Sequence, residues 1–229
     1  MSTSAKVTAR QRIENLLDDN SFVEIGAYVK ARNTDFNIQA KDTPSDGVIT
    51  GYGVINGGLV YVYSQDASVL GGSVGEMHAK KIASLYDMAM KTGSPVIGLI
   101  DSTGLRLQES VDGLNAFGQI YMKQSLASGV IPTVTAIFGN CGGGLSIVAG
   151  LSDFTFMEVE NAQLFVNSPN AITENRKEIC DNASAKFQSE EAGNVDFVGT
   201  EAEVIEGIRN LVSVLPSNNE DEASDLECY

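Results

Sequence analysis

The chain has 229 residues, of which 43% are hydrophobic, enough for one sizeable globular core. Its 30 acidic and 15 basic residues give a net charge of −15, which argues against nucleic-acid or anionic-membrane binding, so an anionic ligand would need a local basic patch. The N-terminus lacks a signal-peptide core and no stretch approaches the roughly 20 apolar residues of a membrane span, so we expect a soluble, cytoplasmic protein without direct membrane insertion.

The first predicted elements are a helix and a hairpin. Residues 8–22 carry apolar side chains at helical spacing and end in Asp-Asp-Asn, which is typical of a helix stop. Two runs rich in Val, Ile and Tyr follow at residues 47–55 and 58–63. Because Asn56-Gly57 joins them, they are predicted to form a β-hairpin.

The rest of the chain alternates between predicted helices and strands, so we expect an α/β fold. The predicted helices span residues 76–91, 114–127 and 201–215, and the predicted strands span residues 95–100, 131–138, 154–159 and 163–166. Pro216 is expected to end the fold. Residues 220–229 form an acidic tail that is either a mobile end or a segment leading to a partner contact.

The first of three glycine-rich loops contains Gly142, Gly143 and Gly144, between a predicted strand and an apolar helix. Glycine lets the backbone approach a ligand closely, and the N–H groups of a helix start can then stabilise negative charge on oxygen. The loop is not a phosphate P-loop, because Leu145 stands where that motif needs a Lys before the hydroxyl residue, here Ser146. The alternative is that these glycines only permit close packing of helix on strand.

The second loop, IDSTGLRLQE, also turns from a strand end through a glycine. The backbone of Gly104 and Leu105 could donate another N–H to the same oxygen, since oxyanion holes usually combine donors from two loops. Arg106 would then lie beside the substrate. The alternative is that Asp101 or Ser102 caps the next helix and that Arg106 pairs with Glu109 three residues on.

The third loop, with Gly71, Gly72 and Ser73, leads into the helix that carries Lys80 and Lys81. Because the chain is acidic, a helix N-terminus that follows glycines and lies near two lysines is a candidate binding site for the phosphates of an anionic ligand such as CoA. The lysines could equally form an ordinary solvated face. His78, the only histidine, falls on the apolar face of this helix and is predicted to be a core residue.

Several catalytic patterns are absent from the sequence. There is no GxSxG elbow, no HExxH motif and no Ser-His-Asp pattern. The cysteines Cys141, Cys180 and Cys228 form no CxxC pair, so neither disulfides nor a zinc ribbon nor any other metal site is expected. Cys141 is interpreted as a small buried residue. Any chemistry would therefore rest on backbone N–H groups.

Taken in order, these loops resemble the N-terminal half of the biotin-dependent acyl-CoA carboxyltransferase family, part of the crotonase-like superfamily. TARQRIENLLDDNSFVEIG resembles its opening helix, SQDASVLGGSVGEMHAKKI is close to QDxxxxGGSxGExHxxKI, and GNCGGGLSIVAGLSDFTFM matches its GxCAGGG loop. IDSTGLRLQE is similar to DSGGARIQE, with Thr103 and Leu105 departing from it, and Gly142 replaces an alanine. Residues 171–188 fit worst, and the family's histidine is replaced around Gln188.

The resemblance implies a single crotonase-like domain over residues 1–219, built as a spiral of ββα units. It implies an acyl-CoA substrate whose enolate is held by the N–H groups of Gly143 and Gly144. The carboxyl group would pass to biotin on a separate carrier protein, in a site on a second, homologous half. That half would come from another polypeptide, unless the chain is a fragment, and the two would form a hetero-oligomer built on dimers.

Two other functions remain open at this point. A stand-alone crotonase-like hydratase, isomerase or thioesterase would need an acid or base beside the glycines, and Asp153 is the nearest candidate. A non-catalytic assembly subunit would keep the glycines for packing alone. The sequence also leaves open the acyl group, the direction of reaction, and whether the carrier is a biotinyl protein or an acyl-carrier thioester.

Overall fold

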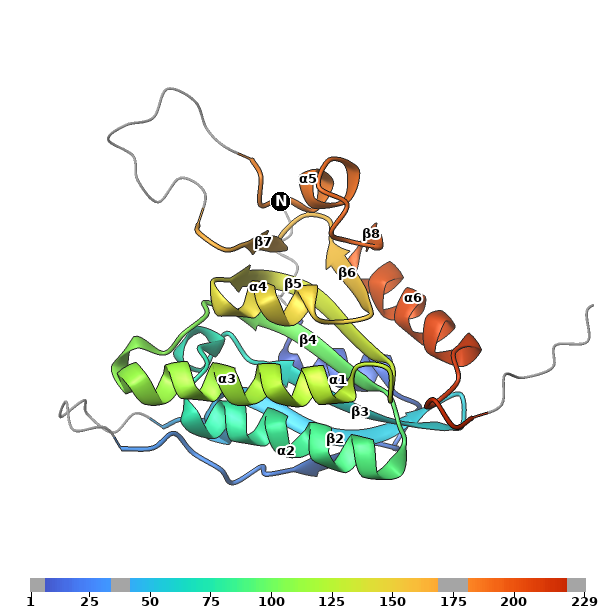
Figure 1. Cartoon of the computed structure of the whole chain (residues 1–229), viewed down its shortest axis with the longest axis horizontal. Coiled ribbons are helices and arrows are strands. Elements are labelled where there is room, and N and C mark those ends of the chain that lie inside the picture. Colours follow the sequence, from blue (N-terminus) through green and yellow to red (C-terminus); the bar gives the residue numbers. More distant parts are fainter. Residues whose placement is uncertain (1–6, 34–41, 169–180, 222–229) are drawn as a thin grey trace, which may run out of the picture.

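A computed structural model describes residues 7–33, 42–168 and 181–221, which form one mixed sheet of eight strands covered by helices on both faces (Figure 1). The sheet order is β1-β2-β3-β4-β5-β6-β8, with β7 paired to the end of β5. β1 to β3 pair antiparallel and the other pairs are parallel. The strands are β1 Val23–Ile25, β2 Val48–Ile55, β3 Gly58–Gln65, β4 Val96–Ser102, β5 Thr133–Gly142, β6 Phe154–Glu158, β7 Gln163–Phe165 and β8 Phe197–Gly199.

The helices divide between the two faces of the sheet. Apolar side chains of α2, α3 and α4 pack on one face, and those of α1 and α6 pack on the other (Figure 1). The helices are α1 Ala9–Leu16, α2 Glu76–Thr92, α3 Ser110–Ala127, α4 Gly144–Gly150, α5 Ala185–Glu190 and α6 Glu201–Val214. Three short 3-10 helices lie at η1 Pro44–Gly47, η2 Leu70–Gly72 and η3 Leu107–Glu109.

Local sequence signals explain why the first elements form. Thr8 and Gln11 make a reciprocal capping box that starts α1, which ends at Leu16 before the Asp-Asp-Asn segment. Asn56 and Gly57 both have positive φ, as a two-residue hairpin turn of type I′ requires, so the predicted hairpin is confirmed.

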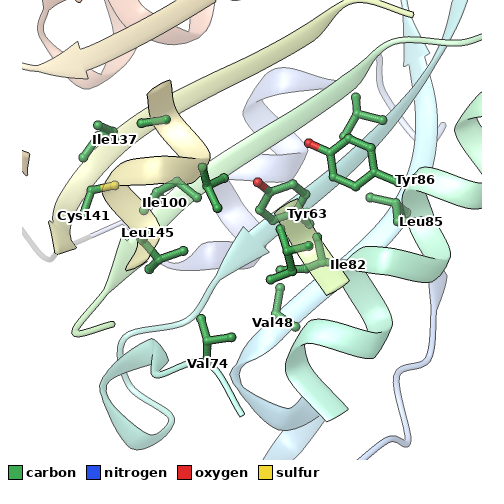
Figure 2. Close-up of a cluster of buried hydrophobic side chains, with 14 of the residues drawn as sticks. Val48, Tyr63, Val74, Ile82, Leu85, Tyr86, Ile100, Ile137, Cys141 and Leu145 are labelled. Carbon is green, nitrogen blue, oxygen red and sulfur yellow. The ribbon is translucent and has the colours of Figure 1, made fainter. Parts of the chain in front are cut away.

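The core on the α2, α3 and α4 side contains the residues that could have been mistaken for catalytic groups. Figure 2 shows Cys141 in this core together with Ile100, Ile137 and Leu145. Burial raises the pKa of the Cys141 thiol to about 12, so it stays protonated and unreactive at neutral pH. His78 is fully buried, and its desolvation lowers the pKa of the imidazole to about 3. Both residues are core residues, as predicted.

Four boundaries differ from the sequence prediction. β4 and β5 extend to Ser102 and Gly142, because Ser102 still pairs with Cys141 beyond the predicted strand ends. α3 begins at Ser110 rather than near residue 114. Pro216 does not end the fold, since Asn218 Nδ2 donates to Gly93 O at 3.0 Å and Asn219 N donates to Val130 O at 3.0 Å.

Two predicted segments lie partly or wholly outside the described residues. Residues 222–229 of the predicted acidic tail and residues 169–180 of the poorly matching segment are among them. Within the described part of that segment, Gln188 is buried in α5 and its Nε2 donates to Leu164 O at 3.2 Å. In the described ranges, no helix has the length and apolar character needed to cross a bilayer.

Candidate functional site

The first two glycine loops meet where β4 and β5 end. These neighbouring strands are parallel, so the loops that follow them leave the same edge of the sheet. The contact is close, because a Cβ added at Gly104 would lie 3.1 Å from Gly142 O. A register shift also falls here: three β5 residues, 138 to 140, stand opposite Asp101 alone. Such a bulge changes the direction of the strand and of the loop that follows it.

The three glycines of the first loop differ in what surrounds them. A Cβ on Gly142 would lie 2.6 Å from the Phe165 ring, and one on Gly144 would lie 2.7 Å from Tyr121 Oη. These two positions are therefore glycine for packing, as the alternative interpretation proposed. Gly143 has φ 60° and ψ −126°, and a Cβ there would meet no atom within 4 Å. Its α-carbon faces open space beside the start of α4.

The peptide between Gly143 and Gly144 has a fixed direction. Gly143 O accepts hydrogen bonds from Ser146 Oγ at 2.7 Å and from Ser146 N at 3.1 Å. In a trans peptide the C=O and N–H point in opposite directions, so the N–H of Gly144 points away from α4. No side chain caps this helix start, and within the described residues no acceptor takes the Gly144 N–H.

The second loop has the same arrangement. Gly104 O accepts the N–H of Val74 at 2.8 Å, so the N–H of Leu105, in the same peptide, points away from Val74. The Leu105 N–H has no acceptor in the described part of the chain. Two candidate donors thus come from two loops in contact, each with the carbonyl of its own peptide already bonded.

The other two predicted donors are already used within the chain. Gly143 N donates to Phe165 O at 3.0 Å, which extends the pairing of β5 with β7. Gly104 N donates to Ser102 Oγ at 3.1 Å. Of the four backbone groups that the sequence indicated, only those of Gly144 and Leu105 are left to face a substrate oxygen.

The glycines of the third loop pack closely against the second loop. A Cβ on Gly72 would lie 2.4 Å from Asp101 O, and one on Gly71 would lie 3.0 Å from the Thr103 side chain. Thr103 N donates to Gly71 O at 2.9 Å. Gly72 and Ser73 are buried, whereas Gly71 is half-buried, so of these three residues only Gly71 remains a candidate to line a ligand site.

The two lysines of α2 have different environments. Lys81 is buried, and its Nζ donates to Ser45 O at 2.9 Å and to Val48 O. Its desolvation lowers the pKa of the amine to about 8. Lys81 therefore cannot reach a CoA phosphate, contrary to the expectation. Lys80 is half exposed and pairs with Glu76 Oε1 at 2.7 Å, so it is the lysine of the pair that a ligand can approach.

Arg106 is likewise buried, which corrects its expected place beside the substrate. Its Nη1 lies 2.5 Å from Asp46 Oδ1 and 2.9 Å from Glu109 Oε1, so the pairing with Glu109 that the sequence offered as the alternative is present. Neither Asp101 nor Ser102 caps the next helix, which begins after Glu109 without a side-chain cap.

The start of α2 is not free for a phosphate. Glu76 N donates to Glu109 Oε2 at 2.6 Å, and His78 N donates to Asp46 Oδ2 at 2.8 Å. Two carboxylates therefore occupy the positive end of this helix and would repel an anion. Ser146 and these two acids were missed by the sequence analysis as parts of the site. The i+3 spacing of Arg106 and Glu109 indicated Glu109 alone, whereas no local signal pointed to Asp46 or Ser146.

Asp153 holds the opposite end of β5 in place. Its Oδ2 accepts from Thr133 N and Thr133 Oγ1, both at 2.8 Å. Thr133 to Cys141 of β5 runs beside Val96 to Ser102 of β4, six residue steps of about 3.3 Å, so the two ends of β5 lie about 20 Å apart. Asp153 therefore cannot act as an acid or base at the glycine loops. In the described ranges, no three His, Cys, Asp or Glu side chains group closely enough to hold a metal ion.

Comparison with known proteins assigns the family. The carboxyl transferase domain model matches residues 2–229. The chain belongs to this family. It is 43% identical over 229 residues to the methylmalonyl-CoA decarboxylase subunit alpha of Propionigenium modestum, covering 98% of the chain and 44% of that relative. The carboxyl transferase chain described here thus spans less than half the length of this relative.

Two solved structures place this carboxyl transferase domain among known folds. Transcarboxylase 12S, crystallised with methylmalonyl-CoA and methylmalonic acid, superposes with a TM-score of 0.89 at 38% identity, over 95% of this chain and 43% of that one. A chain of a Pseudomonas malonate decarboxylase hetero-dimer gives 0.74 at 27% identity, over 92% and 88%. The predicted crotonase-like α/β fold is confirmed.

Proposed function

We propose that this chain is the acyl-CoA half of a carboxyltransferase that moves a carboxyl group between the α-carbon of an acyl-CoA and biotin. The observation that carries the proposal is the 43% identity to a methylmalonyl-CoA decarboxylase subunit along nearly the whole chain. The two glycine loops in contact add the physical reason, because they offer N–H groups from Gly144 and Leu105 without acceptors in the described residues.

In the proposed reaction the residues of this chain stabilise an enolate. When the bond between the α-carbon and the carboxyl group breaks, its electron pair is delocalised onto the thioester oxygen, which becomes negatively charged. Donors fixed before the reaction stabilise that charge without reorganising, and one such donor contributes roughly 2.7 to 4 kcal/mol. Gly144 and Leu105 supply these donors, and the open space at Gly143 leaves room for the acyl group.

Biotin, on a separate carrier protein, would supply the ureido nitrogen that accepts the carboxyl group while its proton goes to the α-carbon, or that gives up the carboxyl group in the reverse exchange. Its ureido oxygen would need donors of its own, and the described residues hold only one pair of glycine loops with unoccupied donors in contact. We therefore assign the biotin site to a homologous half of the carboxyltransferase. The hetero-dimeric malonate decarboxylase offers a precedent, since this chain spans 88% of one of its chains.

The surface of α3 supports the presence of such a partner. Large apolar side chains lie exposed on the side of α3 opposite its buried face and in the preceding η3. The helix α4 lies next to α3 (Figure 1) and adds two more exposed apolar side chains. We call this set the apolar stripe: Leu107, Val111, Leu114, Met122, Leu126, Ile147 and Leu151. Exposed large apolar side chains that gather on one surface are often covered by a partner protein.

The apolar stripe begins beside both donor loops. Leu107 follows Leu105 by two residues, and Ile147 follows Gly144 by three. A protein that covers the stripe would therefore also close the site against water. We assign the stripe to the homologous half, so that the acyl-CoA site and the biotin site meet across the interface.

The function is tested by mixing the chain with its homologous half and following a ¹⁴C-carboxyl label from methylmalonyl-CoA to free biotin. We expect transfer only by the mixture, with propionyl-CoA as the product. Transfer by this chain alone would overturn the half-site assignment. A mixture that never labels biotin but hydrates or hydrolyses acyl-CoA would overturn the carboxyltransferase assignment.

The interface is tested with Val111→Asp and Leu114→Asp. Each places a charge in the apolar stripe, and we expect the complex with the homologous half to dissociate on a sizing column. Val214→Asp in α6 is the matched control, because Val214 is as exposed as Val111 but lies in a helix on the other face of the sheet. Equal behaviour of the Val111 and Val214 variants would place the interface elsewhere.

A further inference from the structure

Three charged side chains lie buried together behind the second glycine loop. We call them the buried ion cluster: Asp46 from η1, Arg106 from the loop itself and Glu109 from η3. Their side chains are exposed by 0%, 3% and 1% respectively. Burying two carboxylates and one guanidinium removes their hydration, so such a cluster needs a compensating set of hydrogen bonds.

The compensation comes from α2. The carboxylate oxygens that do not accept from Arg106 accept backbone N–H groups in the first turn of α2, from Glu76 to Glu109 at 2.6 Å and from His78 to Asp46 at 2.8 Å. The positive end of the helix dipole adds to this attraction. The buried ion cluster therefore ties two segments of the chain, η1 and residues 106–109, to one helix start. It leaves no space at Gly75, where a Cβ would lie 2.4 Å from Glu109 Oε1.

The same cluster holds the peptide of Leu105. Arg106 N donates to Val74 O at 2.9 Å, and Val74 N donates to Gly104 O at 2.8 Å, so both neighbours of Leu105 are bonded to Val74. The Arg106 guanidinium then donates through Nη2 to Ser73 O at 2.7 Å. Residues 73 and 74 are thus held by the main chain and by the side chain of Arg106 at once.

Stability alone is a weak reason for this arrangement. A buried ion pair is often no more stabilising than apolar side chains of the same volume. Desolvation raises the pKa of Asp46 above its ordinary value even though Arg106 opposes the shift, so keeping Asp46 ionised costs free energy in the folded chain. What the cluster does provide is a single geometry, since a planar guanidinium accepts few arrangements of its partners.

We propose that the buried ion cluster positions the Leu105 N–H by fixing the second glycine loop against the start of α2. Arg106 is then a positioning residue for the reaction and touches no substrate. The inference rests on the proposed function, in which the Leu105 N–H donates to the thioester oxygen. Misplacing a catalytic group by about 1 Å can cost roughly 100-fold in rate.

The test uses Arg106→Lys in the complex of this chain with its homologous half. Lysine keeps the charge but cannot bond two carboxylates and Ser73 O together. We expect kcat for carboxyl transfer from methylmalonyl-CoA to fall about 10- to 100-fold, while the Kd for propionyl-CoA stays within about twofold. A residue needed only for folding would lower the melting temperature without lowering kcat per folded complex.

Arg209→Lys is the matched control. Arg209 also bonds a carboxylate, Asp18 at 2.7 Å, and a backbone oxygen, Leu16 O at 2.6 Å, but it joins α6 to α1 on the other face of the sheet. We expect it to change stability and leave kcat unaltered. Glu109→Gln keeps the shape of the cluster and serves if Arg106→Lys does not fold.

Two outcomes would overturn the inference. One is an unchanged kcat in folded Arg106→Lys and Glu109→Gln complexes. The other is a loss of acyl-CoA affinity in proportion to the loss of rate, which would mean that the cluster shapes the binding site as a whole. Failure of the proposed function is recognised separately, because the wild-type complex would then transfer no carboxyl group at all.

Discussion

Replacing Gly143 by alanine tests the candidate oxyanion site most directly. Gly143 has φ 60° and ψ −126°, a backbone conformation that side-chain-bearing residues avoid, at a cost of about 1–3 kcal/mol. The new methyl group meets nothing within 4 Å, so the strain comes from the backbone and not from a clash. Rotation about ψ of residue 143 relieves the strain but turns the following peptide, which carries the Gly144 N–H. Losing that donor would lower kcat by about 10²–10³-fold.

The assay follows carboxyl transfer in the complex with the homologous half, alongside urea unfolding of the chain alone. Gly150→Ala is the control, because Gly150 ends the same helix, lacks the unusual backbone angles, and has open space where the new methyl group would lie. We expect it to be neutral or slightly stabilising, with normal kcat. A Gly143→Ala variant that is less stable yet keeps full kcat would refute the placement of the donor. It would show that strain at residue 143 weakens the fold without affecting the reaction.

Three further predictions concern single side chains. Ser146→Ala should lower kcat and Ser146→Thr should retain it, because the hydroxyl that bonds to Gly143 O orients the Gly144 N–H. Ser213→Ala is the control: it removes a hydroxyl bond of the same i−3 type, to Asn210 O at 2.7 Å, and should not change kcat. Lys80→Glu should raise the KM for propionyl-CoA several-fold with little change in the free energy of unfolding. Lys81→Glu should lower the free energy of unfolding by about 3 kcal/mol or more, because it buries a carboxylate against two backbone carbonyls. Equal effects of the two variants on KM and on stability would contradict the different burial of the two lysines. The pKa of His78 is about 3 in the folded chain and 6.5 in the unfolded chain, so the unfolded chain binds the extra proton between these values. The free energy of unfolding should therefore fall as the pH drops from 6.5 toward 3, by up to about 1.4 kcal/mol per pH unit. Urea midpoints measured at several pH values should fall less steeply in His78→Gln than in the wild type.

The order of elements could be predicted from the sequence because its signals act over a few neighbouring residues. The capping box of Thr8 and Gln11, the Asn56-Gly57 turn and the apolar periodicity of α2 and α6 each fix a helix or a turn locally. The strand ends were missed, because the pairing of Ser102 with Cys141 joins residues far apart in the chain. The end of the fold was missed for the same reason, since Asn218 and Asn219 bond to partners in distant loops.

The location of the candidate site was also present in the sequence, since glycine loops after two buried strands mark where backbone groups can face a ligand. Only the tertiary structure decided which of those groups are free, because Gly143 N–H is taken by Phe165 O from a strand that pairs across the sheet. The tertiary structure also decided which of the charged side chains a ligand can reach. Lys80 and Lys81 are adjacent in the chain, yet on a helix their side chains point about 100° apart, so one reaches solvent and the other is buried against η1. Local patterns specify the kind of element a residue belongs to, whereas burial and partners depend on which distant segments pack against it.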